Sequence, residues 1–265
     1  MRTIKLLIAY DGTDFCGWQR QAGQRTVQAV IETALEQMHR HPVTLTGAGR
    51  TDSGVHAAGQ AAGFRTDIET IKPNRFVPAL NGLLSPDVRI LESCEVQPDF
   101  HARFDARKRT YRYYFICGRQ ALPHESRYAL QLWHSPRIEL LNAYCRLLLG
   151  ERDCSIFAAS ERSGASGKSG SDDTGKSRSR YISHAAFFTD GSRLVFEISA
   201  NAFLWKMVRS IAGTFLHYEE RDTPPELLRD IIASGSRDCA GPTLPPQGLF
   251  LWKVDYGVPL CVRAE

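Results

Sequence analysis

Hydrophobic residues along this chain repeat with two spacings, one typical of helices and the other of strands. The clearest helical pattern predicts an amphipathic helix over residues 26–40 from six apolar side chains: Val27, Val30, Ile31, Ala34, Leu35 and Met38. Further helices are predicted over residues 73–84, 138–149, 204–218 and 223–233. Short apolar runs bounded by turn residues predict strands over residues 4–10, 43–46, 58–64, 88–96, 110–115, 181–188, 193–199 and 249–255.

The order of these elements narrows the fold class. Strands and helices alternate irregularly, and the turn at residues 189–192 joins two strands as a hairpin. This arrangement favours an α+β architecture over a doubly wound one. Residues 160–180 are rich in Ser, Gly, Lys and Arg and cannot fill a core, so they predict a flexible loop inside a domain.

A polar, glycine-rich stretch at residues 47–57 contains almost no side chains that could fill a core. Glycine lets the backbone approach a ligand closely, so this loop can hold Asp52 at a fixed and exposed position. Arg50 favours the ionised form of the Asp52 carboxylate, which suits a nucleophile or an electrostatic stabiliser better than a general acid. A surface turn in which Asp52 and Ser53 cap backbone amides explains the same residues equally well.

Basic and aromatic residues are interleaved between residues 103 and 114, where they comprise Arg103, Phe104, Arg107, Lys108, Arg109, Tyr111, Arg112, Tyr113 and Tyr114. This composition is typical of an RNA-binding platform, although solvated arginines would also protect an edge strand. The coincidence of charge and aromatic rings favours RNA. A second polar loop, residues 11–21, carries Trp18 beside Arg20; Trp18 could stack on a base, but burial in the core is the favoured interpretation.

Composition excludes several classes of protein. The 265 residues, 43% of them hydrophobic and 23% charged, predict a soluble globular chain of about two domains. A net charge of +4 permits an anionic partner without requiring one. The seven cysteines are scattered, so neither a disulfide framework nor a zinc site is expected, and a reducing cytoplasm fits best. No apolar stretch is long enough to cross a membrane.

Several motifs, taken in order, resemble the tRNA pseudouridine synthase A family nearly end to end. The most specific is AGRTDSGVH at residues 48–56. The others are YDG (10–12) with GWQRQ (17–21), DFHARF (99–104) with YRY (111–113), ANAF (200–203) with MVR (207–209), and GLFL (248–251) with VDY (254–256). The segment 160–180 is longer and more polar than is usual in the family.

The resemblance implies an isomerase that converts uridine to pseudouridine in the anticodon stem-loop of tRNA, at positions 38, 39 and 40 of the tRNA. It implies Asp52 as the nucleophile, Tyr111 packed on the target base and Arg209 paired with Asp52. Arg50 would displace the target base, and Leu249 would wall the uracil pocket. Weaker RNA contacts are expected from His101, Arg103, Arg107, Lys108, Arg112 and Arg20. Gly47, Gly49 and Gly54 should let the backbone approach a flipped nucleotide.

The implied fold is α+β, with two domains whose antiparallel sheets join into one continuous mixed sheet flanked by helices. The domains are expected over residues 1–105 and 106–265, with the active site in a cleft between them: Asp52 on one side, Arg209 and Leu249 on the other. The resemblance further implies a homodimer that binds tRNA in the cytoplasm, with no organic cofactor, no catalytic metal and no membrane.

Three alternatives remain open on the sequence. A synthase of the same superfamily could act on another RNA, and an RNA-binding or RNA-folding protein could keep the scaffold without catalysis. The presence of Asp52, Tyr111 and Arg209 together argues against the second alternative. The basic strand could also serve a protein partner.

Overall fold

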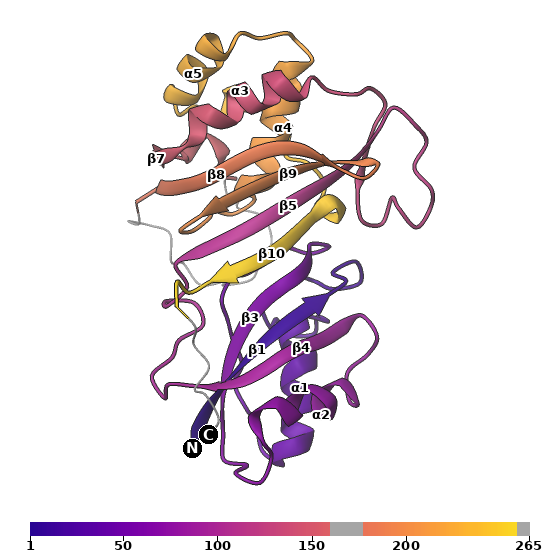
Figure 1. The fold of residues 1–265 in the computed structure, drawn as a ribbon, viewed down its shortest axis with the longest axis vertical. Helices are drawn as coiled ribbons and strands as arrows, with labels where there is room; N and C mark the ends of the chain where they lie inside the picture. Colours follow the sequence, from indigo (N-terminus) through magenta and orange to yellow (C-terminus); the bar gives the residue numbers. More distant parts are fainter. Residues whose placement is uncertain (160–176, 259–265) are drawn as a thin grey trace. The chain divides into compact units, whose positions relative to one another are not determined.

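The computed structural model describes residues 1–159 and 177–258, which fall into two compact units (Figure 1). Unit 1 comprises Met1–Ile116, Gln120–Gln131 and Pro246–Glu265, and unit 2 comprises Cys117–Arg119 and Leu132–Pro245. The strand over residues 249–255 therefore groups with the N-terminal residues. The folding-domain boundary expected near Asp105 stays a prediction.

Unit 1 is built on a mixed sheet in the order β4-β1-β3-β10-β5, with β2 beside β3 and β6 beside β5. Its strands are β1 (Arg2–Tyr10), β2 (Thr46–Gly47), β3 (His56–Thr66), β4 (Val88–Val96), β5 (Lys108–Cys117), β6 (Leu130–Leu132) and β10 (Leu249–Asp255). β10 runs parallel to β3 and antiparallel to β5. It thus connects the strand that follows the Asp52 loop to the basic aromatic strand.

One face of β1 supplies much of the core of unit 1. Ile4, Leu6 and Ile8 are fully buried, whereas Lys5 and Leu7 between them are partly exposed. This alternation is what a strand with one buried face requires. Figure 1 shows the helices α1 (Val27–His39) and α2 (Phe76–Asn81) beside this part of the sheet, and a 3₁₀ turn over Pro73–Arg75 precedes α2.

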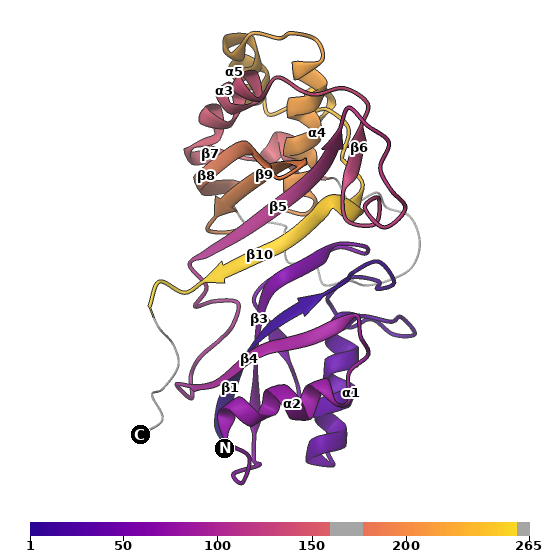
Figure 2. The ribbon, with the colours of Figure 1, turned by 45° about the vertical axis from the view of Figure 1, so that its right-hand side comes forward.

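Unit 2 contains an antiparallel sheet of β7 (Gly150–Asp153), β8 (Ser179–Asp190) and β9 (Arg193–Ala200). Figure 2 shows the helices α3 (Ile138–Leu148), α4 (Met207–Glu219) and α5 (Pro225–Ala233) beside these strands. Phe187 and Phe196 stack across β8 and β9 with ring centroids 4.6 Å apart, and Phe196 also contacts Phe215 of α4. Three further 3₁₀ turns span Ser155–Phe157, Arg237–Cys239 and Pro246–Gly248.

Two local predictions were wrong, each for a physical reason. Residues 43–45 form no strand, because the backbone of Leu45 bonds helix side chains: its N–H donates to Glu32 Oε1 and its carbonyl accepts from Gln28 Nε2. The helix predicted over residues 223–233 also begins later than expected, at Pro225. Pro224 is the N-cap residue, so Thr223 lies one position outside the helix, where its backbone N–H bonds Tyr218 instead.

The other predicted elements are present with bounds within about three residues of the prediction, whereas β6 and β7 were not predicted. Helices beside a mixed sheet confirm the α+β class. Of the loop expected over residues 160–180, residues 160–176 lie outside the described part of the chain. Cys94 is disulfide-bonded, which corrects the prediction for that residue, whereas five other cysteines are free thiols. No helix within residues 1–159 and 177–258 is long and apolar enough to cross a membrane.

Candidate active site

Asp52 lies in the loop that joins β2 to β3, and its side chain is partly exposed. The backbone N–H of Val55 donates to the Asp52 carbonyl oxygen at 3.1 Å, which closes a tight turn around the carboxylate. Arg50 is exposed on the same loop. The loop therefore presents one acidic and one basic side chain at the protein surface.

Three buried side chains form hydrogen bonds with this loop. The Tyr10 hydroxyl lies 2.8 Å from the hydroxyl of Thr51, and Gln60 Nε2 donates to the Gly49 carbonyl at 2.8 Å. Arg109 Nη2 donates to the Ala48 carbonyl at 3.0 Å. These residues come from β1, β3 and β5, so three strands hold the residues that precede Asp52. Buried hydrogen bonds of this kind are costly to break.

The segment 15–18 braces the same loop through its backbone. Trp18 N–H donates to the Thr51 carbonyl at 3.1 Å, and the Phe15 carbonyl accepts from the Gly54 N–H and from the Ser53 hydroxyl. Trp18 is only 1% exposed, which confirms the interpretation that it fills the core and excludes stacking on RNA from this position.

Two of the three loop glycines serve protein packing, which corrects their expected role. A Cβ at Gly47 would lie 2.5 Å from the Trp18 ring. Gly54 has a φ of +76°, and a Cβ there would meet the ring of Pro246 at 2.9 Å. Only Gly49 has open space in front of it, since the nearest atom, the Tyr111 hydroxyl, lies 3.9 Å from the Cβ position.

Tyr111 and Leu249 lie on the same face of the sheet, next to the Asp52 loop. β5 and β10 pair so that Tyr111 lies opposite Leu251 and Tyr113 opposite Leu249, and alternate residues share a face. Burial, followed by the negative charge of Asp52, raises the pKa of Tyr111, so the phenol stays neutral and its hydroxyl faces the loop. Leu249 groups with Asp52 in unit 1, and the expected cleft with Leu249 on the side of Arg209 stays a prediction.

Arg209 lies in the first turn of α4, in unit 2. Its Nε donates to the carbonyl oxygen of Leu244 at 2.6 Å, and its own carbonyl accepts from the Leu244 N–H. The pairing of Arg209 with Asp52 stays a prediction.

The residues predicted to contact RNA differ in their exposure and in their ion pairs. Arg103 and Arg107 are exposed and Lys108 is half-buried, with its ammonium 3.8 Å from Asp255. Arg20 pairs with the buried carboxylate of Glu32 at 3.2 Å.

Arg112 differs from these residues, because strand alternation turns it away from the face that carries Tyr111. Its guanidinium carbon lies 4.1 Å from the centre of the Trp252 ring. Arg109, in contrast, shares the face of Tyr111. The sequence analysis named Arg109 in the basic run but gave it no role. Because Arg109 lies two residues before Tyr111, strand alternation could have predicted that the two side chains share a face.

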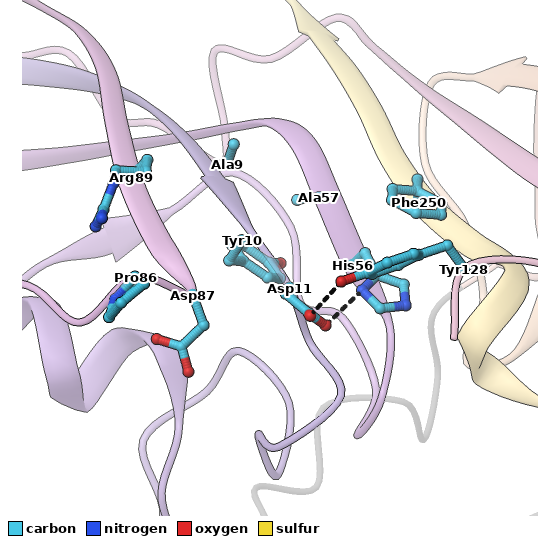
Figure 3. Close-up of a pocket in the computed structure, with 10 residues that line it drawn as sticks. All are labelled: Ala9, Tyr10, Asp11, His56, Ala57, Pro86, Asp87, Arg89, Tyr128 and Phe250. Atoms are coloured by element: carbon cyan, nitrogen blue, oxygen red, sulfur yellow. Dashed lines mark hydrogen bonds and ion pairs between the residues drawn. The ribbon is translucent and has the colours of Figure 1, made fainter. Parts of the chain in front are cut away.

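A pocket of about 230 Å³ opens on the opposite face of the sheet, lined by Asp11, His56, Tyr128 and Phe250 among others (Figure 3). His56 is completely buried and stacks on Phe250 at 4.6 Å. Its Nδ1 accepts from the Gly12 N–H and its Nε2–H donates to the Gln247 carbonyl, so the ring is neutral. Burial lowers the pKa of His56 despite the carboxylate of Asp11 at 3.2 Å.

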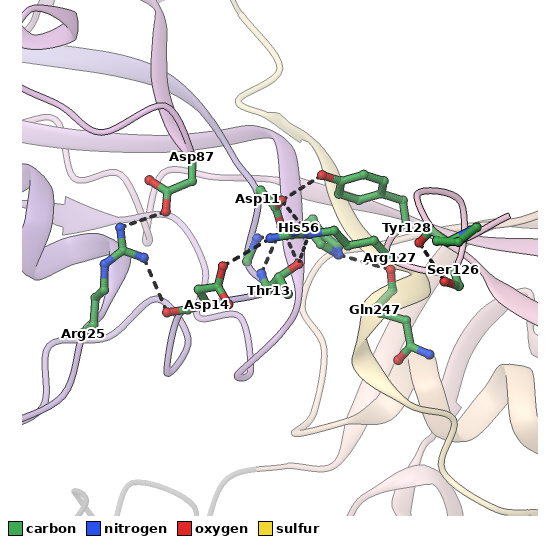
Figure 4. A network of polar contacts seen from close by, with 12 residues as sticks. Asp11, Thr13, Asp14, Arg25, His56, Asp87, Ser126, Arg127, Tyr128 and Gln247 are labelled. Carbon is green, nitrogen blue, oxygen red and sulfur yellow. Dashed lines mark hydrogen bonds and ion pairs between the residues drawn. The ribbon is translucent and has the colours of Figure 1, made fainter.

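The polar groups beside this pocket bond mainly to one another (Figure 4). Asp11 accepts hydrogen bonds from the Tyr128 hydroxyl at 2.8 Å and from both the backbone and the hydroxyl of Thr13. These bonds hold the pKa of Asp11 below its usual value although burial alone would raise it. Arg127 adds ion pairs with Asp11 and Asp14.

Comparison with known proteins defines the class of enzyme. A family model described as tRNA pseudouridine synthase matches residues 6–105 and 144–257, which include Asp52, Arg209 and Leu249. The chain belongs to the tRNA pseudouridine synthase family, and the expectation of an isomerase that acts on uridine in tRNA is confirmed. Tyr111 lies between the two matched parts.

Relatives named tRNA pseudouridine synthase A match nearly the whole chain. The protein from Treponema denticola is 47% identical over 260 residues, covering 96% of this chain and 93% of its own length. A relative from Treponema pallidum is 44% identical over 91% of this chain and 84% of its own. One from Shouchella clausii is 38% identical over 99% of this chain and 97% of its own.

Proposed function

We propose that this protein converts uridine to pseudouridine in the anticodon stem-loop of tRNA, at positions 38, 39 and 40, with Asp52 as the nucleophile. The observation that carries the proposal is the placement of a partly exposed carboxylate on a loop held by three buried side chains and facing Tyr111. A nucleophile must be fixed relative to its target, and these contacts fix it.

The reaction rearranges bonds within one nucleotide. The bond between ribose C1′ and uracil N1 breaks, the uracil turns within the pocket, and C1′ joins C5. The proton on C5 leaves and N1 gains one, so no atom is lost from the nucleotide. Asp52 attacks either ribose C1′ or uracil C6 as an ionised carboxylate, and both routes require the same position next to the target.

The neighbours of Asp52 suit a uridine that has left the RNA stack. Extracting a base costs a few kcal/mol, which contacts in the pocket must offset. Tyr111 supplies a ring face, and stacking on an aromatic side chain is worth roughly 1–3 kcal/mol. Leu249, 5% exposed on the same sheet face, supplies an apolar wall, and the exposed Arg50 can occupy the vacated site. Gly49 leaves the backbone open to the nucleotide.

We propose that Arg209 pairs with Asp52, as the family resemblance implies. Its Nε bond to the Leu244 carbonyl restricts the guanidinium, which favours a fixed ion pair. His101, Arg103, Arg107, Lys108 and Arg20 are proposed to contact the phosphate backbone, with Arg112 contributing from the other sheet face. We further propose a homodimer that works in the cytoplasm.

A tritium-release assay tests the proposal. A tRNA transcript carrying tritium at C5 of its uridines loses the label to water when the base is rejoined through C5. The wild-type chain should release label from positions 38, 39 and 40, and replacing each uridine with cytidine should remove the corresponding share. Release from uridines elsewhere would refute the assignment of the anticodon stem-loop.

The role of Asp52 is tested by Asp52→Asn, which keeps the size of the side chain and removes its charge. We expect no label release while tRNA affinity is retained. Asp14→Asn is the matched control, because Asp14 is an exposed carboxylate whose ion pair with Arg127 lies outside the loop. Turnover by Asp52→Asn at the wild-type rate would show that another group is the nucleophile.

A further inference from the structure

An exposed aromatic ring lies on the turn just before β5. The side chain of Phe104 is 75% exposed, although burying a phenylalanine is favourable. Its ring stacks on the imidazole of His101 with centroids 4.2 Å apart and planes inclined by 29°. The guanidinium carbon of Arg103 lies 5.9 Å from the ring centre. An exposed ring in contact with a cation is the composition of a base-stacking surface.

The turn itself is held rigidly. The His101 N–H donates to Asp105 Oδ2 at 2.8 Å, and the Asp105 N–H donates back to the His101 carbonyl at 3.1 Å. His101 Nδ1 accepts from the backbone N–H groups of Arg103 and Phe104. The Phe104 ring is therefore preorganised on the surface, and binding a ligand would cost little additional ordering.

One buried arginine ties this turn to the Asp52 loop. Arg109 donates to the carbonyl of Arg103 at 2.6 Å and to the carbonyl of Ala48 at 3.0 Å through the same Nη2. Its Nη1 donates to the Ala106 carbonyl at 2.9 Å. The backbone that carries Phe104 and the start of the loop that carries Asp52 are thus neighbours, each one hydrogen bond away from Arg109.

We propose that Phe104, together with His101 and Arg103, forms a platform that stacks a nucleobase next to the target uridine in the RNA. The inference rests on the proposed function. When a uridine leaves the stack, its neighbour loses a stacking partner, and an aromatic ring fixed beside the catalytic loop replaces it. Exposed Arg103 and Arg107 place positive charge around the ring, which favours a polyanion over an apolar protein surface.

The position of the ring is tested by photo-cross-linking. An anticodon stem-loop carries 5-iodouridine at one of the positions flanking the target, and complexes with the full-length Asp52→Asn chain are irradiated. We expect mass spectrometry to find a cross-link on Phe104 from one flanking position. Phe104→Tyr should keep it, whereas Phe104→Leu should lose it, because leucine keeps apolar bulk without a ring to stack.

Affinity and turnover are measured with Phe104→Ala and Phe104→Tyr in the active chain. Phe104→Ala should raise Kd for the stem-loop about 10-fold, the effect of losing one stacked base, with Phe104→Tyr close to wild type. Leu91→Ala is the control, since Leu91 is an exposed apolar residue of β4 and lies outside the turn that carries Phe104. It should leave both Kd and turnover unchanged.

Three results would overturn the platform. The first is a wild-type Kd and turnover for Phe104→Ala. The second is a cross-link on other residues in place of Phe104. The third is a changed dimer dissociation constant with unchanged RNA binding, which would assign Phe104 to a protein interface. A wild-type chain that releases no tritium from the tRNA would instead refute the proposed function itself, so the two failures are distinguishable.

Discussion

The two faces of the sheet in unit 1 carry two polar assemblies that use their groups differently. Around Asp11 and His56, the polar groups have hydrogen-bond partners within the protein. The Asp11 carboxylate accepts from the hydroxyls of Tyr128 and Thr13, and both imidazole nitrogens of His56 have backbone partners. Around Asp52, buried side chains bond the loop backbone and leave the carboxylate partly exposed at the surface. The first arrangement stabilises a fold, and the second presents the proposed nucleophile.

A shifted pKa alone therefore does not identify a reactive site. The pKa values of Asp11, His56 and Tyr128 are all shifted, beside a pocket. Such clusters are candidates for function, yet ion-pair networks that serve stability shift pKa values too. The network at Asp11 is of that second kind, because its hydrogen-bonding capacity is spent within the protein.

The largest expected effect separates the two carboxylates. Asp52→Asn should lower the single-turnover rate at least about 1,000-fold, because it removes the charge of the proposed nucleophile. Asp11→Asn should do the opposite: the melting temperature falls while the folded protein keeps its rate. Tritium release and thermal unfolding of both variants make the comparison. Equal rates for the two variants would contradict the assignment of different roles to Asp52 and Asp11.

Arg109 should matter next, because it supports the Asp52 loop and the Phe104 turn together. Arg109→Met keeps the apolar stem but leaves the carbonyls of Ala48, Arg103 and Ala106 without this donor, at a cost of about 3 kcal/mol in unfolding free energy. Urea unfolding measures the loss. Arg107→Met is the control, since Arg107 is exposed. A change under 0.5 kcal/mol for Arg109→Met, the usual range of a surface substitution, would mean the bonds are dispensable.

Two glycines of the loop should respond in contrasting ways. Gly47→Ala forces a methyl group against the Trp18 ring and should cost about 2 kcal/mol in unfolding free energy. Gly49→Ala meets only the Tyr111 hydroxyl at 3.9 Å, so it should fold like the wild type while its affinity for RNA falls. Urea unfolding and filter binding measure the two effects. Gly49→Ala with wild-type affinity would show that no nucleotide approaches this backbone.

The smallest expected effect is a loss of folding stability at acidic pH. Burial lowers the pKa of His56 below its ordinary 6.5, so the unfolded chain takes up a proton that the folded chain refuses. Stability is then fully present above pH 6.5 and is lost as the pH falls, by at most about 2 kcal/mol at pH 5. His56→Gln should show a shallower decline between pH 6.5 and 5 in urea unfolding. Parallel curves for the two proteins would refute this contribution.

The sequence alone determined most of the elements and the family. Helical spacing located α1 to within a residue at each end, and short apolar runs located β1, β4 and β10, because local periodicity reflects which face each element buries. The motif around Asp52 pointed to the right family. The chain by itself could not say why Gly47 and Gly54 are glycines, or that Leu249 lies in the same unit as Asp52.

Only the tertiary structure decided these matters, because they depend on residues far apart in the chain. Gly47 is required by Trp18 and Gly54 by Pro246, and neither neighbour is visible in a local pattern. Leu45 looks like a strand residue until its backbone meets Glu32. Arg109 looks like one more cation in a basic run, yet the pairing of β5 with β10 fixes that strand so that its guanidinium reaches the Asp52 loop and the Phe104 turn.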